Sequence, residues 1–209
     1  FTNGEEYAAK TDPNDAKSHG DLISKLKVAE VKTTMWLLEF NSVLGKGFQF
    51  NFKYREPGGK PEANRMGAAD AIAAGELFFK EGVGKGRFKL LRTENREMDT
   101  STGRKPVPFA IVQDQLENKK GQEYELQFGM KQAQLNETIK YDHTVVFYLD
   151  AIGESGNKFE IVENGTFSLP HGGEEKIYKL DEVILGEDKK PSSVIVTWGA
   201  DGKREIPVN

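Results

Sequence analysis

The stretch Phe48-Gln49-Phe50-Asn51-Phe52-Lys53-Tyr54-Arg55 decides the fold class. Its four aromatic residues alternate with polar and charged ones, and in a β-strand successive side chains point to opposite faces. One face of this strand is therefore aromatic and the other is polar, which is typical of a strand in one half of a β-sandwich. We predict that the four rings point into the protein interior and that Pro57-Gly58-Gly59 ends the strand.

Similar patterns cover most of the remaining chain. Residues 26–30 alternate, and residues 35–40 form a dense apolar run, as expected for a strand that is buried on both faces. From residue 76 onward, short β-type runs are separated by turns rich in Gly, Pro and Asn, which favours a sandwich or a barrel. The strands predicted there are residues 76–80, 87–92, 107–113, 123–128, 144–152, 159–162, 166–169, 177–185, 193–198 and 204–208.

Three local features complete this prediction. Residues 1–24 are polar and rich in turn formers, and we interpret them as a lead-in with one helical turn near residues 5–10. The Ala-rich segment 67–75 is the one short helix that we predict beyond the lead-in. Asp201-Gly202 lies between two strand-like runs and predicts a two-residue type I′ hairpin turn.

An internal repeat organises the predicted strands. A shift of ninety residues superimposes two pairs of segments, Gly75-Glu-Leu77-Phe-Phe79 on Gly165-Thr-Phe167-Ser-Leu169 and Phe88-Lys-Leu90 on Tyr178-Lys-Leu180. With a shorter loop in the second copy, Leu126 falls on Ile206. The repeat predicts two copies of one four-stranded unit. The alternative is that β turns reuse the same residue types and that the match arose by chance.

These observations give a fold class and a division of the chain. We predict a mostly β protein with a β-sandwich architecture, two tandem β modules and one short helix. The lead-in covers residues 1–24, the first β-sandwich module residues 25–130 and the second residues 131–209.

The composition excludes several classes of protein. The chain has 209 residues, of which 30% are charged and 37% are hydrophobic, so its composition is that of an ordinary globular protein. It has no Cys, which excludes a disulfide scaffold, a Cys-based zinc site and a thiol nucleophile. The formal net charge of −4 argues against binding nucleic acid. No apolar run approaches the roughly 18 residues that span a bilayer, so we predict no direct membrane span in this chain.

Two motifs that suggest ligand binding have a simpler explanation. Residues 46–52 match part of an RNA-recognition signature, but the opposite face of that module is apolar, whereas here it is polar. Packing of the rings in the core is therefore favoured over an exposed sugar-stacking platform and over nucleic-acid binding. Residues 82–86 are rich in Gly, but Arg87 stands where a phosphate-binding loop needs a hydroxyl, so we interpret them as a β turn.

The remaining polar residues give no metal site and no catalytic pair. Residues 12–16 resemble the start of a calcium loop, but Ala16 and Ile23 replace the required oxygen ligands. Glu160 and Glu163 fall on opposite faces of a strand and do not form a glycosidase pair. The three histidines lie far apart, and we interpret them as surface residues: His19, His143 and His171. We predict no catalytic residue, no cofactor-binding residue and no metal ligand.

Three segments carry a resemblance to a known family: Gly86-Arg-Phe-Lys-Leu-Leu-Arg-Thr-Glu-Asn-Arg-Glu-Met98, Pro108-Phe-Ala-Ile-Val-Gln-Asp114 and Lys120-Gly-Gln-Glu-Tyr-Glu-Leu126. Together with the size and the repeat, they resemble verrucomicrobial, Akkermansia-type pilus-locus proteins. That resemblance implies an immunoglobulin-like β-sandwich related to archaeal-type pilins. It also implies an export signal removed before Phe1 and a role in type IV pilus assembly or at the cell surface.

The leading functional hypothesis is a non-enzymatic cell-envelope protein. We expect an accessory or structural component of a type IV pilus-like assembly, located in the periplasm, in the outer membrane or at the cell surface. Its partners would be other envelope or pilus-assembly proteins, or further copies of itself, and it would need no cofactor. The longest polar excursions, residues 97–106 and 57–65, are the contact loops that we predict, with simple spacers as the alternative.

The alternative function is a carbohydrate-binding β-sandwich module at the cell surface. It would use Trp36, Trp198 or Tyr141 as the surface on which a glycan stacks. This hypothesis predicts that at least one of these rings is exposed on a flat or concave face. A hydrolase, the third class, would require a pocket in which carboxylates converge.

Overall fold

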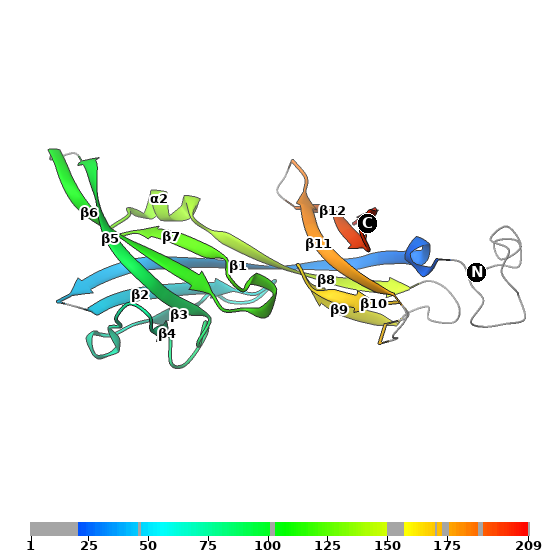
Figure 1. Ribbon diagram of the computed structural model, residues 1–209, viewed down its shortest axis with the longest axis horizontal. Helices are drawn as coiled ribbons and strands as arrows, with labels where there is room; N and C mark the ends of the chain where they lie inside the picture. The colour runs from blue at the N-terminus through cyan, green and yellow to red at the C-terminus, as the bar shows by residue number, and fades with distance from the viewer. Residues whose placement is uncertain are drawn as a thin grey trace, which may run out of the picture. The chain divides into compact units, whose positions relative to one another are not determined.

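The computed structural model describes residues 21–45, 47–100, 103–149, 157–169, 171–172, 176–187 and 190–208. These residues form three antiparallel sheets and one short α-helix, which confirms the predicted mostly β class with one short helix (Figure 1). The immunoglobulin-like subtype stays a prediction.

The largest sheet has five strands in the order β3-β2-β1-β8-β9. Its strands are β1 (Leu26–Leu44), β2 (Gly47–Arg55), β3 (Glu62–Arg65), β8 (Lys140–Leu149) and β9 (Lys158–Val162). The first four-stranded sheet consists of β4 (Leu77–Phe78), β5 (Phe88–Thr100), β6 (Gly103–Asp114) and β7 (Glu123–Gln127). The second consists of β10 (Thr166–Ser168), β11 (Ile177–Leu185), β12 (Pro191–Trp198) and β13 (Gly202–Pro207).

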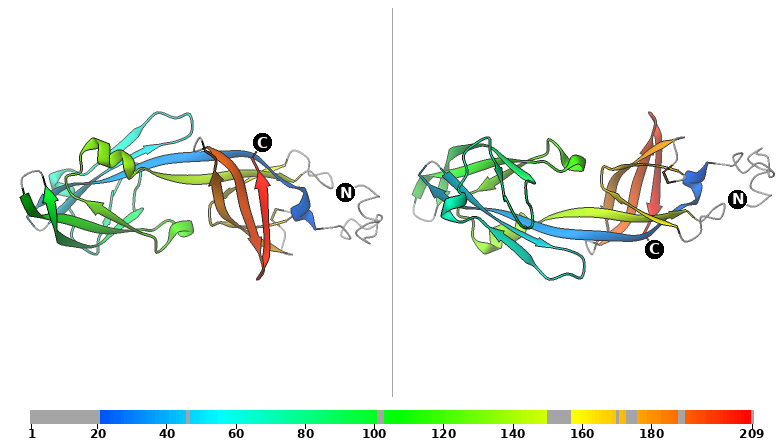
Figure 2. Two further views of the ribbon diagram at one scale, coloured as in Figure 1. Left: turned by 90° about the horizontal axis from the view of Figure 1, so that it is seen from above. Right: turned by 90° about the horizontal axis from the view of Figure 1, so that it is seen from below.

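The chain forms two compact units. The central unit is Thr33–Asp142, and the terminal unit combines the residues up to Lys32 with those from His143 onward. This division differs from the predicted boundary at residues 130/131. The reason is that β1 passes from one unit into the other after Lys32, and β8 does so after Asp142. Each unit therefore takes part of the five-stranded sheet and one complete four-stranded sheet, seen as facing layers in Figure 2.

The core of the central unit lies between these two sheets. Phe50 and Phe52 of β2 are fully buried, while Phe48 and Tyr54 are partly buried and pack against the same cluster. The predicted inward orientation of the four rings is therefore confirmed. Phe50 stacks on Phe78 of the opposite sheet with their ring centroids 4.5 Å apart. Residues from both sheets complete this cluster: Trp36, Leu38, Phe40, Phe88, Leu90, Ala110, Val112 and Leu126.

The terminal unit has its own core of the same kind. It contains Phe147 of β8, Phe167 of β10 and Tyr178 of β11, and the rings of Phe147 and Phe167 stack at 5.4 Å. Leu22 and Ile23, from the 3₁₀ turn η1 (Leu22–Lys25), are buried in this core. The predicted lead-in boundary at residue 24 is thus wrong, because these two apolar side chains belong to the sandwich. Residues 1–20, with the helical turn expected near 5–10, lie outside the described residues.

The two four-stranded sheets repeat one design. Leu90 in β5 bonds Gly75 and Glu76 through its main chain, and Leu180 in β11 bonds Asn164 and Gly165 in the same way. A bulge follows at the same place in both strands, between Leu90 and Arg92 and between Leu180 and Glu182. The ninety-residue shift is therefore confirmed for β5 and β11. For β4 and β10 it is wrong by one residue, since Phe78 pairs with Phe88 and Phe167 pairs with Tyr178.

Two local predictions are wrong. Segment 67–75 forms only the 3₁₀ turn η2 (Ala68–Asp70), because Ile72 exchanges two main-chain hydrogen bonds with Phe48 as an isolated bridge. The α-helix is instead α2 (Gln132–Glu137). The hairpin at Asp201-Gly202 exists, but Gly202 already pairs with Trp198, so the loop has three residues and Gly199 carries the positive φ of 56°.

Truncating one central ring tests this packing. Phe50→Ala should lower the free energy of unfolding of the central unit by about 3–5 kcal/mol, because ring contacts are lost and a cavity remains. The measurement is urea unfolding followed by Trp36 fluorescence in a Trp198→Phe background, which leaves Trp36 as the only indole. Arg55→Ala, at an exposed position of the same strand, is the matched control and should change little. A loss below about 1 kcal/mol for Phe50→Ala would contradict the packing.

Candidate functional site

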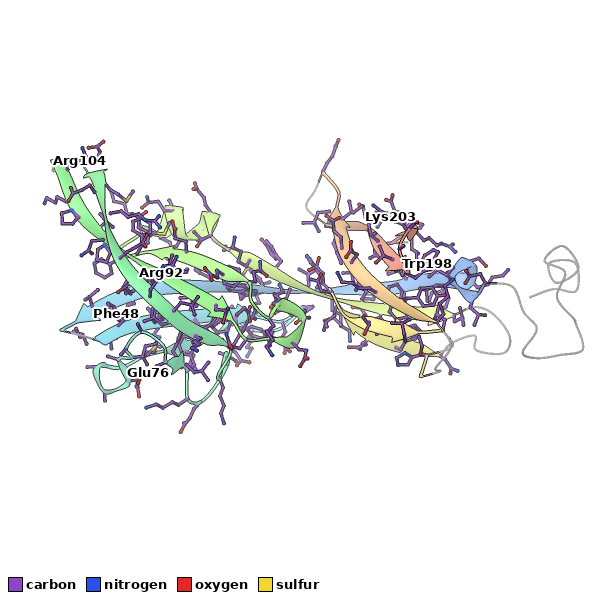
Figure 3. The ribbon with its side chains drawn as sticks, in the orientation of Figure 1. Phe48, Glu76, Arg92, Arg104, Trp198 and Lys203 are labelled. Carbon is purple, nitrogen blue, oxygen red and sulfur yellow. The ribbon has the colours of Figure 1, made fainter. Side chains whose placement is uncertain are left out.

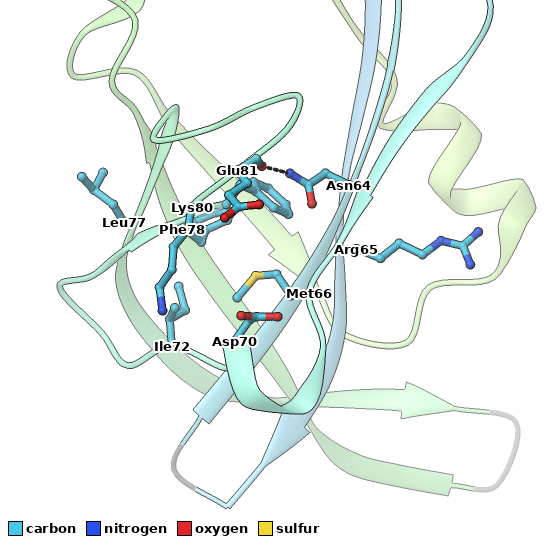
Figure 4. A pocket seen from close by; sticks show the side chains of 10 residues that line it. Asn64, Arg65, Met66, Asp70, Ile72, Leu77, Phe78, Lys80 and Glu81 are labelled. Atoms are coloured by element: carbon cyan, nitrogen blue, oxygen red, sulfur yellow. Dashed lines mark hydrogen bonds between the residues drawn. The ribbon is translucent and has the colours of Figure 1, made fainter.

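A shallow pocket lies in the central unit between the end of β3, η2 and β4 (Figure 4). Its volume is about 320 Å³, at the lower end of the range for small-molecule sites. Met66, Ile72 and Phe78 form its apolar floor, and Asp70, Lys80 and Glu81 bring charge to its rim. Each of the three floor side chains also belongs to the hydrophobic core of the central unit.

The polar groups around this pocket serve the local backbone. The Asp70 carboxylate accepts a hydrogen bond from the Gly67 main-chain N–H at 3.2 Å and closes the η2 turn. The Asn64 side-chain amide donates to the carbonyl oxygens of Glu81 at 2.5 Å and Val83 at 3.0 Å, which holds the following loop against β3. Phe79 has a φ of 63°, and this places its ring in the core at the loop's start. The pocket is thus shaped by contacts that fix a loop.

A buried charge network is the most concentrated polar feature of the central unit. Arg87, just before β5, donates from Nε at 3.1 Å and from Nη2 at 2.9 Å to Oδ2 of Asp114, at the end of β6. Its Nη1 donates to the Asp142 carboxylate at 2.7 Å. Asp142 also accepts from Lys119 Nζ, from the short turn η3 (Glu117–Lys119), at 2.5 Å. Two cations thus face two carboxylates, and Asp114 is fully buried.

The Arg87 guanidinium also rests on aromatic rings. Its central carbon lies 4.5 Å from the centroid of the Trp36 ring and 5.0 Å from that of Phe88. Tyr124 of β7 adds a hydroxyl 3.4 Å from the Asp114 carboxylate. The geometry joins two-pronged charge pairing to cation–π contact, because the flat face of a guanidinium can lie on a ring while its N–H groups point at carboxylates. The network therefore ties β5, β6, η3 and the start of β8 together.

The pKa shifts agree with a structural role. Burial acts to raise the pKa of Asp142, but the hydrogen bond and charge of Arg87, followed by those of Lys119, lower it below its usual range. Burial acts to lower the pKa of Arg87, but the hydrogen bonds and charges of Asp142 and Asp114 outweigh burial and leave this pKa above its usual value. Burial and then the charge of Asp114 raise the pKa of the Tyr124 hydroxyl. All three groups are held in their ordinary charge states near neutral pH.

Sequence reasoning missed this network. The predicted strands ended at residue 113 and began at residue 144, one or two residues short of Asp114 and Asp142. A signal was present, because Asp114 continues the inward alternation of Ala110 and Val112 along β6. A carboxylate at an inward position requires a buried partner, but the sequence does not say which cation supplies it.

The three candidate stacking rings lie on different elements and differ in exposure. Trp36 is buried, with its ring under Arg87, so it offers no face to a glycan. The Trp198 ring lies over the Gly202 backbone, where an added Cβ would stand 2.3 Å from Nε1, and Lys176 Nζ lies 4.9 Å from the ring centroid. Tyr141 alone of the three is clearly exposed, at 45%.

The other residues singled out from the sequence also have structural contacts. His143 is buried in β8, so its assignment to the surface is wrong, and His171 stacks on Phe159 with ring centroids 4.3 Å apart. Glu160 forms an ion pair with Lys32, whereas Glu163 accepts a hydrogen bond from the Val183 main chain. The structure does not bring these two carboxylates together as a pair. His19 and residues 12–16 lie outside the described residues.

Searches of the described residues and of known proteins add three findings. Within the described ranges, no group of three or more His, Cys, Asp or Glu side chains is arranged to hold a metal ion. In the same part of the chain, no helix has the length and apolar character needed to cross a membrane. No family model, curated protein or solved structure matches the sequence or the fold of this chain.

Removing the buried cation tests the network. Arg87→Met should lower the free energy of unfolding of the central unit by about 3–5 kcal/mol, because it leaves two carboxylates without their shared partner. Trp36 fluorescence during urea unfolding, again with Trp198→Phe, measures this change. Arg96→Met is the matched control, since Arg96 bridges Glu94 and Glu125 in the open and its loss should change stability little. Equal effects of the two substitutions would contradict the account.

The lowered pKa of Asp142 gives a pH dependence. The carboxylate binds protons less readily in the folded state than in the unfolded chain, so its stabilising contribution is present above about pH 4. That contribution is lost as pH falls through the folded pKa. We expect Asp142→Asn to be less stable than the parent at pH 7 and to lose less stability between pH 7 and pH 3. Parallel pH profiles for the two proteins, from the same Trp36 measurement, would contradict this expectation.

Proposed function

We propose that this protein is a non-enzymatic, accessory or structural component of a type IV pilus-like assembly in the cell envelope and acts through protein–protein contacts. The three segments that resemble verrucomicrobial pilus-locus proteins support the location. Residues 86–98, 108–114 and 120–126 lie along β5, β6 and β7, so the resemblance is concentrated in one sheet.

The observation that carries the contact function is an extension of the hairpin β5–β6. Beyond the shared bulge, β5 makes nine residue pairs with β6, whereas β11 makes four with β12. On one side, β4 pairs only with Phe88 and Lys89 of β5. On the other side, β7 pairs with β6 only as far out as Phe109, so the last six pairs of the hairpin, from Asn95–Pro108 to Thr100–Gly103, have no third strand. This outer part of the hairpin is a two-stranded ribbon, which is marginal by itself and gains stability from a partner.

The two contact loops predicted at residues 97–106 and 57–65 are largely strand in the structure. Residues 97–100 and 103–106 form the outer part of β5 and β6 rather than a loop, and residues 101–102 lie outside the described residues. In the other excursion, residues 57–61 form a turn and a short link, and Glu62–Arg65 forms the strand β3. Arg92 lies near the base of the ribbon and Arg104 near its end (Figure 3). Their side chains are 59% and 72% exposed.

The polar groups of the interior support the non-enzymatic part of the proposal. The most buried charges, those around Arg87, are paired with one another, and the acids beside the pocket cap turns or face solvent. Catalysis by acids or bases requires a group that is free to exchange a proton with a substrate. The exposed ring of Tyr141 leaves the carbohydrate-binding alternative as a prediction.

Localisation tests the proposed function directly. Antibodies raised against this chain should label surface appendages of the source cells in immunogold electron microscopy, because an assembly component remains with the assembly. In fractionated cells, the chain should occur with the envelope. A strain that lacks the gene is the control for antibody specificity. Recovery of the chain only in the cytosolic fraction, with no labelling of the surface, would overturn the proposal.

A further inference from the structure

One edge of the β5–β6 ribbon presents a regular row of main-chain groups. Leu90 turns its N–H and C=O toward β4, and the bulge after it reverses the alternation of β5. In β6, Pro108 and Asp114 bond toward β7, so the odd-numbered residues of β6 face β5. Their partners in β5 are Arg92, Glu94, Arg96 and Met98. The main-chain groups of the residues between these partners therefore point away from β6: Thr93, Asn95, Glu97 and Asp99.

The two edges of the ribbon differ in their protection. On β6, the outward-facing residues Pro106 and Pro108 have no N–H to donate, and the carbonyl oxygen of Pro108 already accepts from the Phe128 N–H. On β5, the outward row contains no Pro, and no described strand pairs with it beyond Lys89. An edge without such protection is a template for another strand. The free edge of β5 is thus the one open to strand addition.

Charged side chains normally block strand addition, but here their order selects a partner. Arg92, Glu94 and Arg96 share one face of β5 and alternate in sign at two-residue spacing. If a second β5 lies antiparallel with Asn95 opposite Asn95, then Glu94 of each copy faces Arg96 of the other. On the opposite face, Thr93 then faces Glu97, and both can take part in hydrogen bonds.

Neighbouring registers fit less well. Centring the pair on Glu97 places two like charges opposite each other. Centring it on Thr93 would require the second copy to bond the outward N–H and C=O of Leu90. These two groups already form hydrogen bonds with Glu76 and Gly75. We propose that two copies of this chain associate by antiparallel pairing of their β5 edges, with Asn95 at the two-fold axis. This proposal deepens the proposed function and rests on it, because it names a second copy as one contact partner.

A single cysteine gives a register-specific test, because the chain contains no Cys. In Asn95→Cys the two thiols lie opposite each other, so a short bis-maleimide should join two chains efficiently. In Asp99→Cys the thiols lie about 27 Å apart, eight residues along the paired strands, and the same reagent should fail. Equal cross-linking of both variants, or of neither at up to about 1 mM protein, would overturn the proposal.

Sedimentation of the unlabelled protein tests the main-chain contact. Asn95→Pro removes the N–H at the centre of the pair and should weaken dimerisation by at least about tenfold. Asn95→Thr retains the N–H and is the matched control. Because the Asn95 main chain faces away from β6, neither substitution removes a bond within the ribbon. Circular dichroism checks that both variants are folded.

Charge reversal gives a separate test of the pairing, which can be used even if Asn95→Pro does not fold. Glu94→Arg puts a second positive charge opposite Arg96 and should weaken dimerisation, whereas Glu97→Arg makes the same charge change opposite Thr93 and should weaken it much less. Equal effects would overturn the register. A chain that stays monomeric in every arm yet is labelled on surface appendages would contradict self-pairing and leave the proposed function standing, so the two failures are distinguishable.

Discussion

Facing aromatic rings hold each unit of this protein together. In the central unit, Phe50 stacks on Phe78 and Phe52 meets Phe88 edge-on, and both of these contacts join one sheet to the other. Each fully buried ring contributes about 1.5–3 kcal/mol through loss of contact with water. Because both sheets must supply rings at matching heights, this packing fixes the register of β2, β4 and β5 together. The Arg87 network then closes one end of the same core, with its guanidinium against Trp36.

The sequence predicts the features that depend on local alternation. The inward rings of β2, the strand Ile177–Leu185 and the equivalence of Leu90 and Leu180 all follow from residue spacing. Features that depend on distant partners do not follow from it. The Ala-rich segment 67–75 has a helical propensity, but the bridge from Ile72 to Phe48 outweighs it. Asp114 and Asp142 lie 28 residues apart in sequence, and only the folded sheets bring both to Arg87.

The same distinction explains the unit boundary. A repeat in the sequence marks equivalent strands, but it cannot show that the long strand β1 serves both cores. Val28 packs in the terminal unit and Trp36 in the central unit, and both lie on the same β1 face because they are eight residues apart. The first part of β1 thus belongs to the terminal unit, and the chain comes back to that unit after Asp142. This point lies twelve residues beyond the boundary predicted after residue 130.

Most of the described rings pack in the two cores, and the buried charges around Arg87 pair with one another. The contact surface that we propose therefore consists of main-chain groups at a strand edge. The repeat makes the extended ribbon of β5 and β6 conspicuous, because its counterpart in the terminal unit stops five pairs earlier. Residue-resolved amide hydrogen exchange of the dilute protein tests this account most directly. A free edge on β5 predicts slow exchange of the N–H groups that bond β6, those of Arg92, Glu94, Arg96 and Met98. It predicts fast exchange of the outward N–H groups, those of Thr93, Asn95, Glu97 and Asp99. Uniform rates along β5, or the opposite alternation, would contradict a free edge on this strand.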